Sequence, residues 1–132
     1  MNNYDDIDFL APWCALNKIF GFSPKTGLEA IRHFGSAADI FRADKKELSG
    51  FFGYGSKYTG LISGKALQES AEELTGLKES GSRFICIGDS RYPQMLRECE
   101  DPPIGLYIKG KTPIEKLDGG RPAIGVIGTR DI

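Results

Sequence analysis

The sequence has little of what metal sites, disulfide frameworks and membrane spans require. Its 132 residues include one histidine, three cysteines and one tryptophan. The cysteines, Cys14, Cys86 and Cys99, are odd in number and form no Cys-x-x-Cys pair, which is typical of reduced thiols in a cytoplasmic protein. His33 has no partner at metal-ligand spacing, which favours a surface or packing role. We therefore expect no metal ion and no other cofactor.

Long apolar runs are also missing. The longest uncharged apolar stretch, residues 9–16, is far shorter than the ~20 residues that cross a bilayer. Residues 1–6 are acidic and lack the basic start of a signal peptide. Seventeen Lys and Arg face eighteen Asp and Glu, which excludes a strongly basic nucleic-acid arm but not a local basic site. We expect a cytoplasmic protein with no membrane contact.

Residues 1–80 have the pattern of a helical domain. Apolar residues at helical spacing predict a first helix with one apolar stripe, made of Phe9, Trp13, Leu16 and Phe20. Start and stop signals predict three further helices, which begin at Ser23-Pro24, at Ser36 and at Asp44 with Glu47, the second of them following a stop at Gly35. A long helix is expected to begin at Ser56 and end before Gly81, with a kink or a close contact to another helix at its internal glycines. This complete set of signals predicts that the helical half folds independently.

Residues 81–132 have a different pattern. Short β-rich runs occur at residues 83–87, 104–108 and 123–127, with a short helix expected from Tyr92-Pro93. The third run is nearly all apolar, as expected for an interior strand covered on both faces. Strands that alternate with helical segments indicate an α/β domain after the helical one.

A repeat in the helical half points to one candidate site. Residues 20–28 resemble residues 52–61, and the two copies are expected to form paired helical hairpins that share a core. In the second copy, Gly53, Gly55 and Lys57 form a glycine turn that can present backbone N–H groups to a phosphate. The alternative is a purely structural turn, because no cluster of basic residues surrounds either copy.

The third strand points to a second candidate site. It ends in Gly128, Thr129 and Arg130, and ligands of open α/β sheets bind at the carboxyl ends of strands. Gly128 permits a close approach, Thr129 can donate a hydrogen bond, and Arg130 can bind a phosphate or stack on a base. An ordinary turn at the end of a strand is the alternative interpretation.

Several ordered motifs resemble the DprA/Smf family of bacterial DNA-processing proteins. In chain order they are Gly88-Asp89-Ser90-Arg91-Tyr92-Pro93, Asp101-Pro102-Pro103, Leu106-Tyr107-Ile108-Lys109-Gly110 and residues 123–130. The resemblance implies a SAM-like domain of tandem helix-hairpin-helix type (residues 1–80), followed by the first strands of a Rossmann-like domain (residues 81–132). It also implies single-stranded DNA binding, with Gly128, Thr129 and Arg130 in the DNA pocket, and handover of DNA to the RecA recombinase during natural transformation.

The resemblance stops before the rest of the Rossmann-like domain, so we expect a truncated form or fragment. Its third strand would then be exposed and would favour self-association. Two other functions stay open. One is a nucleotide-binding enzyme, although the sequence has no GxGxxG motif and no acid/base pair, and we expect no enzymatic activity. The other is a helical interaction module with no role in DNA binding.

Overall fold

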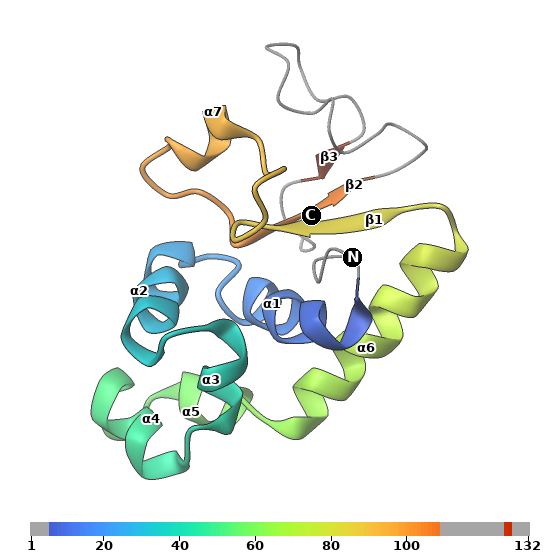
Figure 1. Ribbon diagram of the computed structural model, residues 1–132. Helices are drawn as coiled ribbons and strands as arrows, with labels where there is room; N and C mark the ends of the chain where they lie inside the picture. Colours follow the sequence, from blue (N-terminus) through green and yellow to red (C-terminus); the bar gives the residue numbers. More distant parts are fainter. Residues whose placement is uncertain (1–5, 109–125, 128–132) are drawn as a thin grey trace.

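The computed structural model describes residues 6–108 and 126–127. A helical half is followed by a small sheet (Figure 1). Its elements are α1 (Ile7–Ile19), α2 (Pro24–Phe34), α3 (Ala37–Arg42), α4 (Lys45–Phe52), α5 (Lys57–Leu61), α6 (Gly64–Glu79), β1 (Arg83–Cys86), α7 (Gln94–Arg97), β2 (Gly105–Ile108) and β3 (Val126–Ile127).

The predicted helix boundaries in the first half are largely confirmed. The Ser36 hydroxyl accepts a hydrogen bond from the Asp39 N–H and caps α3. Asp44 and Glu47 form a reciprocal capping box at the start of α4. Gly35 ends α2 at φ 106°, a left-handed conformation that favours glycine. Ser23 precedes α2 as expected, but its side chain makes no capping hydrogen bond.

The predicted long helix from Ser56 to Gly81 is wrong. The chain forms the short helix α5, leaves helical geometry at Ile62, and begins α6 at Gly64. The Ser63 hydroxyl accepts a hydrogen bond from the Ala66 N–H at 3.3 Å, so a new cap starts the second helix. The chain therefore breaks completely before Gly64, whereas Gly60 and Gly76 lie inside α5 and α6.

The sheet has the order β1-β2-β3, and both pairs are antiparallel. Phe84 pairs with Tyr107, and Tyr107 pairs with Ile127 on its other side. This differs from the parallel pairing typical of an α/β domain, because α7 has only four residues and no long crossover helix joins β1 to β2. Of the predicted third strand, residues 126–127 form β3 at one end of the described strand order, and residues 123–125 lie outside the described residues.

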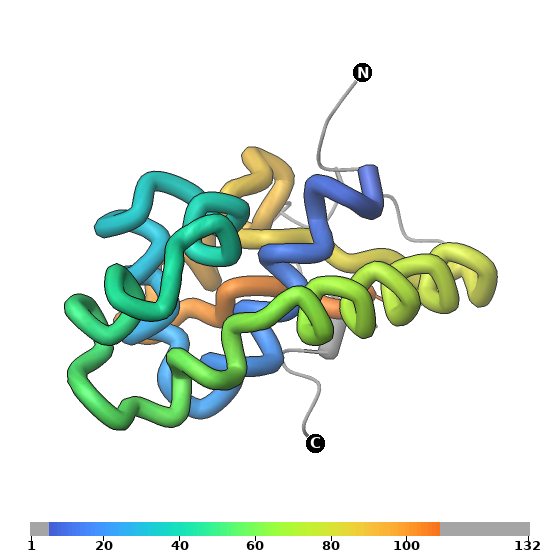
Figure 2. The backbone as a smooth tube through the Cα atoms, turned by 90° about the horizontal axis from the view of Figure 1, so that it is seen from below, coloured from blue at the N-terminus to red at the C-terminus, as the bar shows by residue number. Residues whose placement is uncertain are grey.

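The two halves share an apolar core. Leu10, Ala11 and Cys14 of α1 and Leu74 of α6 pack with three sheet residues, Phe84, Cys86 and Tyr107. Viewed from the side and from below, α1 lies between the sheet and the other helices, with α6 alongside it (Figures 1 and 2). This shared core opposes the expectation that the helical half folds by itself. The domain boundary at residue 80 stays a prediction.

The helix α1 buries more than the single expected stripe. Leu16 and Phe20 lie in a second core cluster with residues of α2, α3 and α4, whereas Phe9 is 36% exposed. The opposite face of α1 supplies Leu10 and Cys14 to the core shared with the sheet. Burial on two sides makes α1 the central helix of the described chain.

The two repeat copies meet through their aromatic residues, as expected for hairpins with one core. The Phe20 ring stacks on the Phe52 ring at 5.8 Å and lies 4.5 Å from the Tyr58 ring. His33 is exposed and packs against the rings of Phe34 and Phe51, which agrees with the predicted surface or packing role.

Candidate nucleic-acid interface

The strand β3 leads directly into the predicted DNA-binding residues. Gly128, Thr129 and Arg130 lie outside the described residues, so their predicted role is untested. The described strands do fix one relationship: β1 and β3 flank the antiparallel β2 and therefore run in the same direction. The carboxyl ends of β1 and β3 consequently lie at one edge of the sheet.

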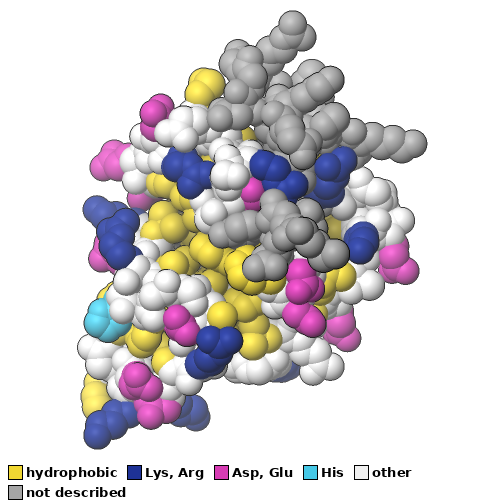
Figure 3. Space-filling model, in the orientation of Figure 1, with side chains coloured by type: hydrophobic (Ala, Val, Ile, Leu, Met, Phe, Trp, Pro, Cys, Tyr) yellow, Lys and Arg dark blue, Asp and Glu magenta, His cyan; other side chains and the backbone are white. Residues whose placement is uncertain are grey.

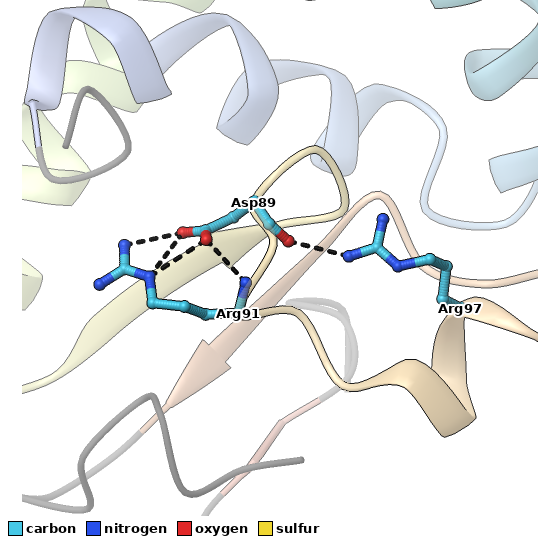
Figure 4. Close-up of polar contacts among 3 residues, drawn as sticks. All are labelled: Asp89, Arg91 and Arg97. Atoms are coloured by element: carbon cyan, nitrogen blue, oxygen red, sulfur yellow. Dashed lines mark hydrogen bonds and ion pairs between the residues drawn. The ribbon is translucent and has the colours of Figure 1, made fainter.

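The loop that follows β1 at this edge is built around a buried carboxylate. Asp89 is 1% exposed, and its oxygens accept hydrogen bonds from the Arg91 backbone N–H and from Arg91 Nε and Nη2 (Figure 4). The Arg91 Nη2 to Asp89 Oδ2 distance is 2.8 Å, and the Arg91 side chain is 18% exposed. A carboxylate buried this deeply is stable only with such charged partners.

A second arginine holds the same loop from α7. Arg97 donates hydrogen bonds to the backbone carbonyls of Ile87 and Asp89, and its guanidinium lies 5.2 Å from the centre of the Tyr92 ring. The Tyr92 hydroxyl donates to the Pro103 carbonyl at 2.8 Å. Its burial raises the pKa of Tyr92, so the phenol stays neutral. These hydrogen bonds hold the loop and α7 in place beside the ends of the strands. We refer to residues 87–97 as the shoulder.

This shoulder carries basic side chains. Lys and Arg side chains gather over the part of the molecule that holds the sheet and α7 (Figure 3). Arg83 in β1, Arg91 in the loop and Arg97 in α7 contribute three positive charges. Asp89 neutralises one of these charges. The acidic residues after α7 are exposed: Glu98, Glu100 and Asp101. The arrangement suits a local anion contact more than a broad basic groove.

The sequence patterns did not identify the Asp89–Arg91–Arg97 arrangement as a site. Its signal is an acidic residue directly after a strand with an arginine two positions later, a spacing that lets the carboxylate accept both the backbone N–H and the guanidinium.

The glycine turn of the second repeat copy is exposed and open. Gly53 and Gly55 have φ values of 99° and 77°, and no heavy atom lies within 4 Å of a Cβ placed on either. The Ser56 hydroxyl caps the N–H of Tyr58, and the Lys57 ammonium lies 5.4 Å from the Tyr58 ring centre. The turn lies at the end of the molecule remote from the described strands (Figure 1).

The described residues contain no metal site and no membrane span. No group of three His, Cys, Asp or Glu residues in residues 6–108 and 126–127 is arranged to hold a metal ion. Within the same part of the chain, no helix has the length and apolar character needed to cross a bilayer. Cys14, Cys86 and Cys99 are free thiols.

Two comparisons with known proteins found similarity, one to the second half of the chain and one to most of it. The family model for DNA recombination-mediator protein A matches residues 83–132. Protein Smf of Synechocystis sp. is 26% identical over 121 residues, which cover 91% of this chain. Both comparisons thus point to the DprA/Smf family, the first through residues 83–132 and the second through most of the chain.

The similarity extends over only part of the relative's length. The matched region is 30% of the length of the Synechocystis Protein Smf. No solved structure matches the chain. The described helices and the small antiparallel sheet are compatible with a helical domain followed by the start of a Rossmann-like domain.

Proposed function

We propose that this DprA/Smf-family chain takes part in DNA processing as a non-catalytic, single-stranded DNA-binding protein that works with the RecA recombinase in the cytoplasm. The observation that carries the proposal is the family match over residues 83–132, which includes the described sheet and the strand that leads into Gly128. The proposed DNA contact is the sheet edge where β1 and β3 end.

The geometry supports this placement in two ways. The shoulder after β1 is fixed by buried hydrogen bonds, so Arg91 and Arg97 are held beside the strand ends at little further entropic cost. Arg130, three residues after Ile127 in the sequence, can add a guanidinium that pairs with a phosphate or stacks on an unpaired base.

The proposal is tested by fluorescence anisotropy with a labelled (dT)20 strand in a salt series. In a protein that carries the whole Rossmann-like domain, Arg130→Ala should weaken binding and flatten the salt dependence, since each lost phosphate contact reduces the number of counterions released. In these 132 residues alone, where most of the expected groove is missing, the same change should do little. Arg32→Ala is the matched control, because Arg32 is exposed on α2 in the helical half. Equal effects of the two substitutions, or binding that does not depend on salt, would contradict the proposed site.

A phosphate contact at Gly53, Gly55 and Lys57 is the second candidate position for DNA. Its support is the open turn and the exposed lysine. Lys57→Ala in the same titration separates the two positions. If Lys57→Ala lowers the affinity for DNA and Arg130→Ala does not, the DNA binds at the helical half.

A further inference from the structure

Two aromatic side chains are exposed at matching positions of the sequence repeat. Phe22 lies in the turn between α1 and α2, and Tyr54 lies in the turn between α4 and α5 (Figure 1). Phe22 is 88% exposed and Tyr54 is fully exposed, which makes them the two most exposed large apolar side chains of the described residues. Single exposed apolar residues are ordinary, but the same exposure at the same place in both copies indicates a shared role.

The fold of the two turns does not depend on these rings. Phe20 and Phe52, two residues earlier in each copy, hold the copies together with ring centres 5.8 Å apart. The second turn takes its shape from Gly53 and Gly55, which have positive φ values. An exposed ring adds little to stability because it removes almost no apolar area from water. Both rings are therefore available to a ligand.

The two exposed rings extend from one aromatic stack. Phe22 and Tyr54 each lie two residues after a member of the stacked pair of Phe20 and Phe52. Two residues span at most about 7 Å of chain, so neither turn can lie far from that pair. One extended ligand can therefore contact both turns.

A lysine follows each exposed ring by three residues. Lys25 follows Phe22, and Lys57 follows Tyr54. Both lysines are exposed, and they are the only charged residues within the two repeat copies. Glu29, one turn after Lys25 in α2, offsets part of the positive charge at the first copy. The two turns thus present the same pair twice, a flat apolar ring and a positive charge.

A single-stranded nucleic acid matches this repeated pair. Each unit of the strand offers a flat base that can stack on an aromatic ring and a phosphate that can pair with a lysine. A duplex does not match, because its bases are already stacked on one another and paired. An apolar protein surface would cover the rings but would leave both lysines without an anionic partner.

We propose that the two turns form a base-stacking site for single-stranded DNA, with one base on Phe22, another on Tyr54, and phosphates beside Lys25 and Lys57. The choice of DNA rests on the proposed function in DNA processing. The site adds base contacts to the phosphate contact considered at the second turn, which lies remote from the described strands (Figure 1). Because only two lysines take part, stacking should supply most of the affinity.

The first test measures the binding of fluorescein-labelled (dT)12 to these 132 residues by anisotropy at low salt. Phe22→Ala and Tyr54→Ala should each lower the affinity at least about fivefold, since each removes the stacking of one base. Tyr54→Phe keeps a flat ring and should keep the affinity, whereas Tyr54→Leu keeps only the apolar bulk and should lose it. Wild-type affinity in either alanine variant would overturn the proposal.

An abasic strand of the same length tests stacking from the side of the ligand. It keeps the phosphates of (dT)12 but has no bases, so it should bind at least about tenfold more weakly. A duplex of the same length should also bind more weakly than (dT)12. Equal binding of the abasic strand and (dT)12 would reduce the turns to a phosphate contact and overturn base stacking.

Matched controls separate binding from folding and from general charge. Because Phe22 and Tyr54 are exposed, their alanine variants should melt at the wild-type temperature in far-UV circular dichroism. Lys25→Ala should weaken binding and lower its salt dependence, whereas Lys78→Ala, at the exposed far end of α6, should do neither. Equal effects of the two lysine variants would contradict a phosphate held at the turns.

The turns and the sheet edge can fail independently. In a protein that carries the whole Rossmann-like domain, failure of the turns leaves the Arg130-dependent binding of (dT)20 intact. Failure of the sheet-edge site leaves binding that depends on Phe22 and Tyr54. In these 132 residues, no binding of (dT)12 at low salt would overturn the site at the turns and leave the sheet-edge proposal standing.

Discussion

The Tyr107 hydroxyl on β2 donates a 2.8 Å hydrogen bond to Glu73 Oε2 on α6, which ties the sheet to the helical half. The Lys18 ammonium of α1 pairs with the other Glu73 oxygen at 3.1 Å. The Cys14 Sγ lies 3.5 Å from the same hydroxyl. Three elements thus meet at one largely buried carboxylate.

Removing the Tyr107 hydroxyl should therefore weaken the contact between the halves. Tyr107→Phe leaves the ring in place but deprives a largely buried carboxylate of a donor, which should lower the free energy of unfolding by about 1–3 kcal/mol. Urea denaturation measures the change. Tyr54→Phe, at a fully exposed tyrosine, should change stability by less than about 0.5 kcal/mol.

The close approach of β2 to β1 depends on a glycine. A Cβ at Gly105 would lie 2.1 Å from Cζ of Phe84, so Gly105→Ala forces the buried ring to move and should destabilise by about 1–3 kcal/mol or more. Gly76→Ala, in open space inside α6, should instead stabilise by about 0.5–1 kcal/mol. Thermal melts of the two variants should shift in opposite directions.

The shoulder at the sheet edge depends on the charge of Asp89. Asp89→Asn leaves the Arg91 guanidinium without its buried carboxylate and should cost about 3–5 kcal/mol. The exposed pair of Asp39 and Arg42 is the matched control, and Asp39→Asn should cost less than about 1 kcal/mol. Similar losses in denaturant titrations of both variants would show that burial does not strengthen the Asp89 pair.

The thiols should differ sharply in reactivity. Burial raises the pKa of Cys14 to about 11 and that of Cys86 to about 12, whereas Cys99 is exposed. A thiol-exchange assay at pH 8 should show one fast thiol, and Cys99→Ser should abolish the fast phase. Two fast thiols in the native protein would contradict the burial of Cys14 and Cys86.

The same thiols predict how stability depends on alkaline pH. In the unfolded chain the pKa of each thiol is near its ordinary value of 9.0, below the folded pKa values of about 11 and 12. The unfolded state therefore loses its thiol protons first, so stability should fall as pH rises from about 9 through 11 to 12. Denaturant titrations over this pH range measure the free energy of unfolding. Cys14→Ala should make that free energy fall less steeply with pH.

The shared core makes a prediction for the isolated helical half. Residues 1–80 alone would expose the apolar faces of Leu10, Cys14 and Leu74 that Phe84 and Tyr107 cover. We expect this fragment to melt at a lower temperature and with less cooperativity than the whole chain, as measured by far-UV circular dichroism. An unchanged melt would show that the sheet adds nothing to the helical core.

Local signals predicted local structure well. The caps at Ser36 and Asp44 and the stop at Gly35 depend on side chains next to the helix ends, so a few residues determine them. The break before α6 was missed although Ser63 could act as a cap, because apolar residues continue at helical spacing on both sides of it.

Long-range relationships were not predictable in the same way. The pairing of Phe84 with Tyr107 and the second buried face of α1 depend on contacts between residues far apart in the chain, which periodicity does not encode. The buried state of Asp89 was missed for the same reason: its burial comes from the return of the chain through α7 and β2.

The position of α1 between two core clusters has a consequence for ligands. A helix that both halves use for burial cannot lose one set of neighbours without weakening the other. A molecule that binds only the folded chain therefore stabilises all of it, wherever on the described chain it binds. Because both halves share α1, a ligand bound to one half should also raise the stability measured in the other half.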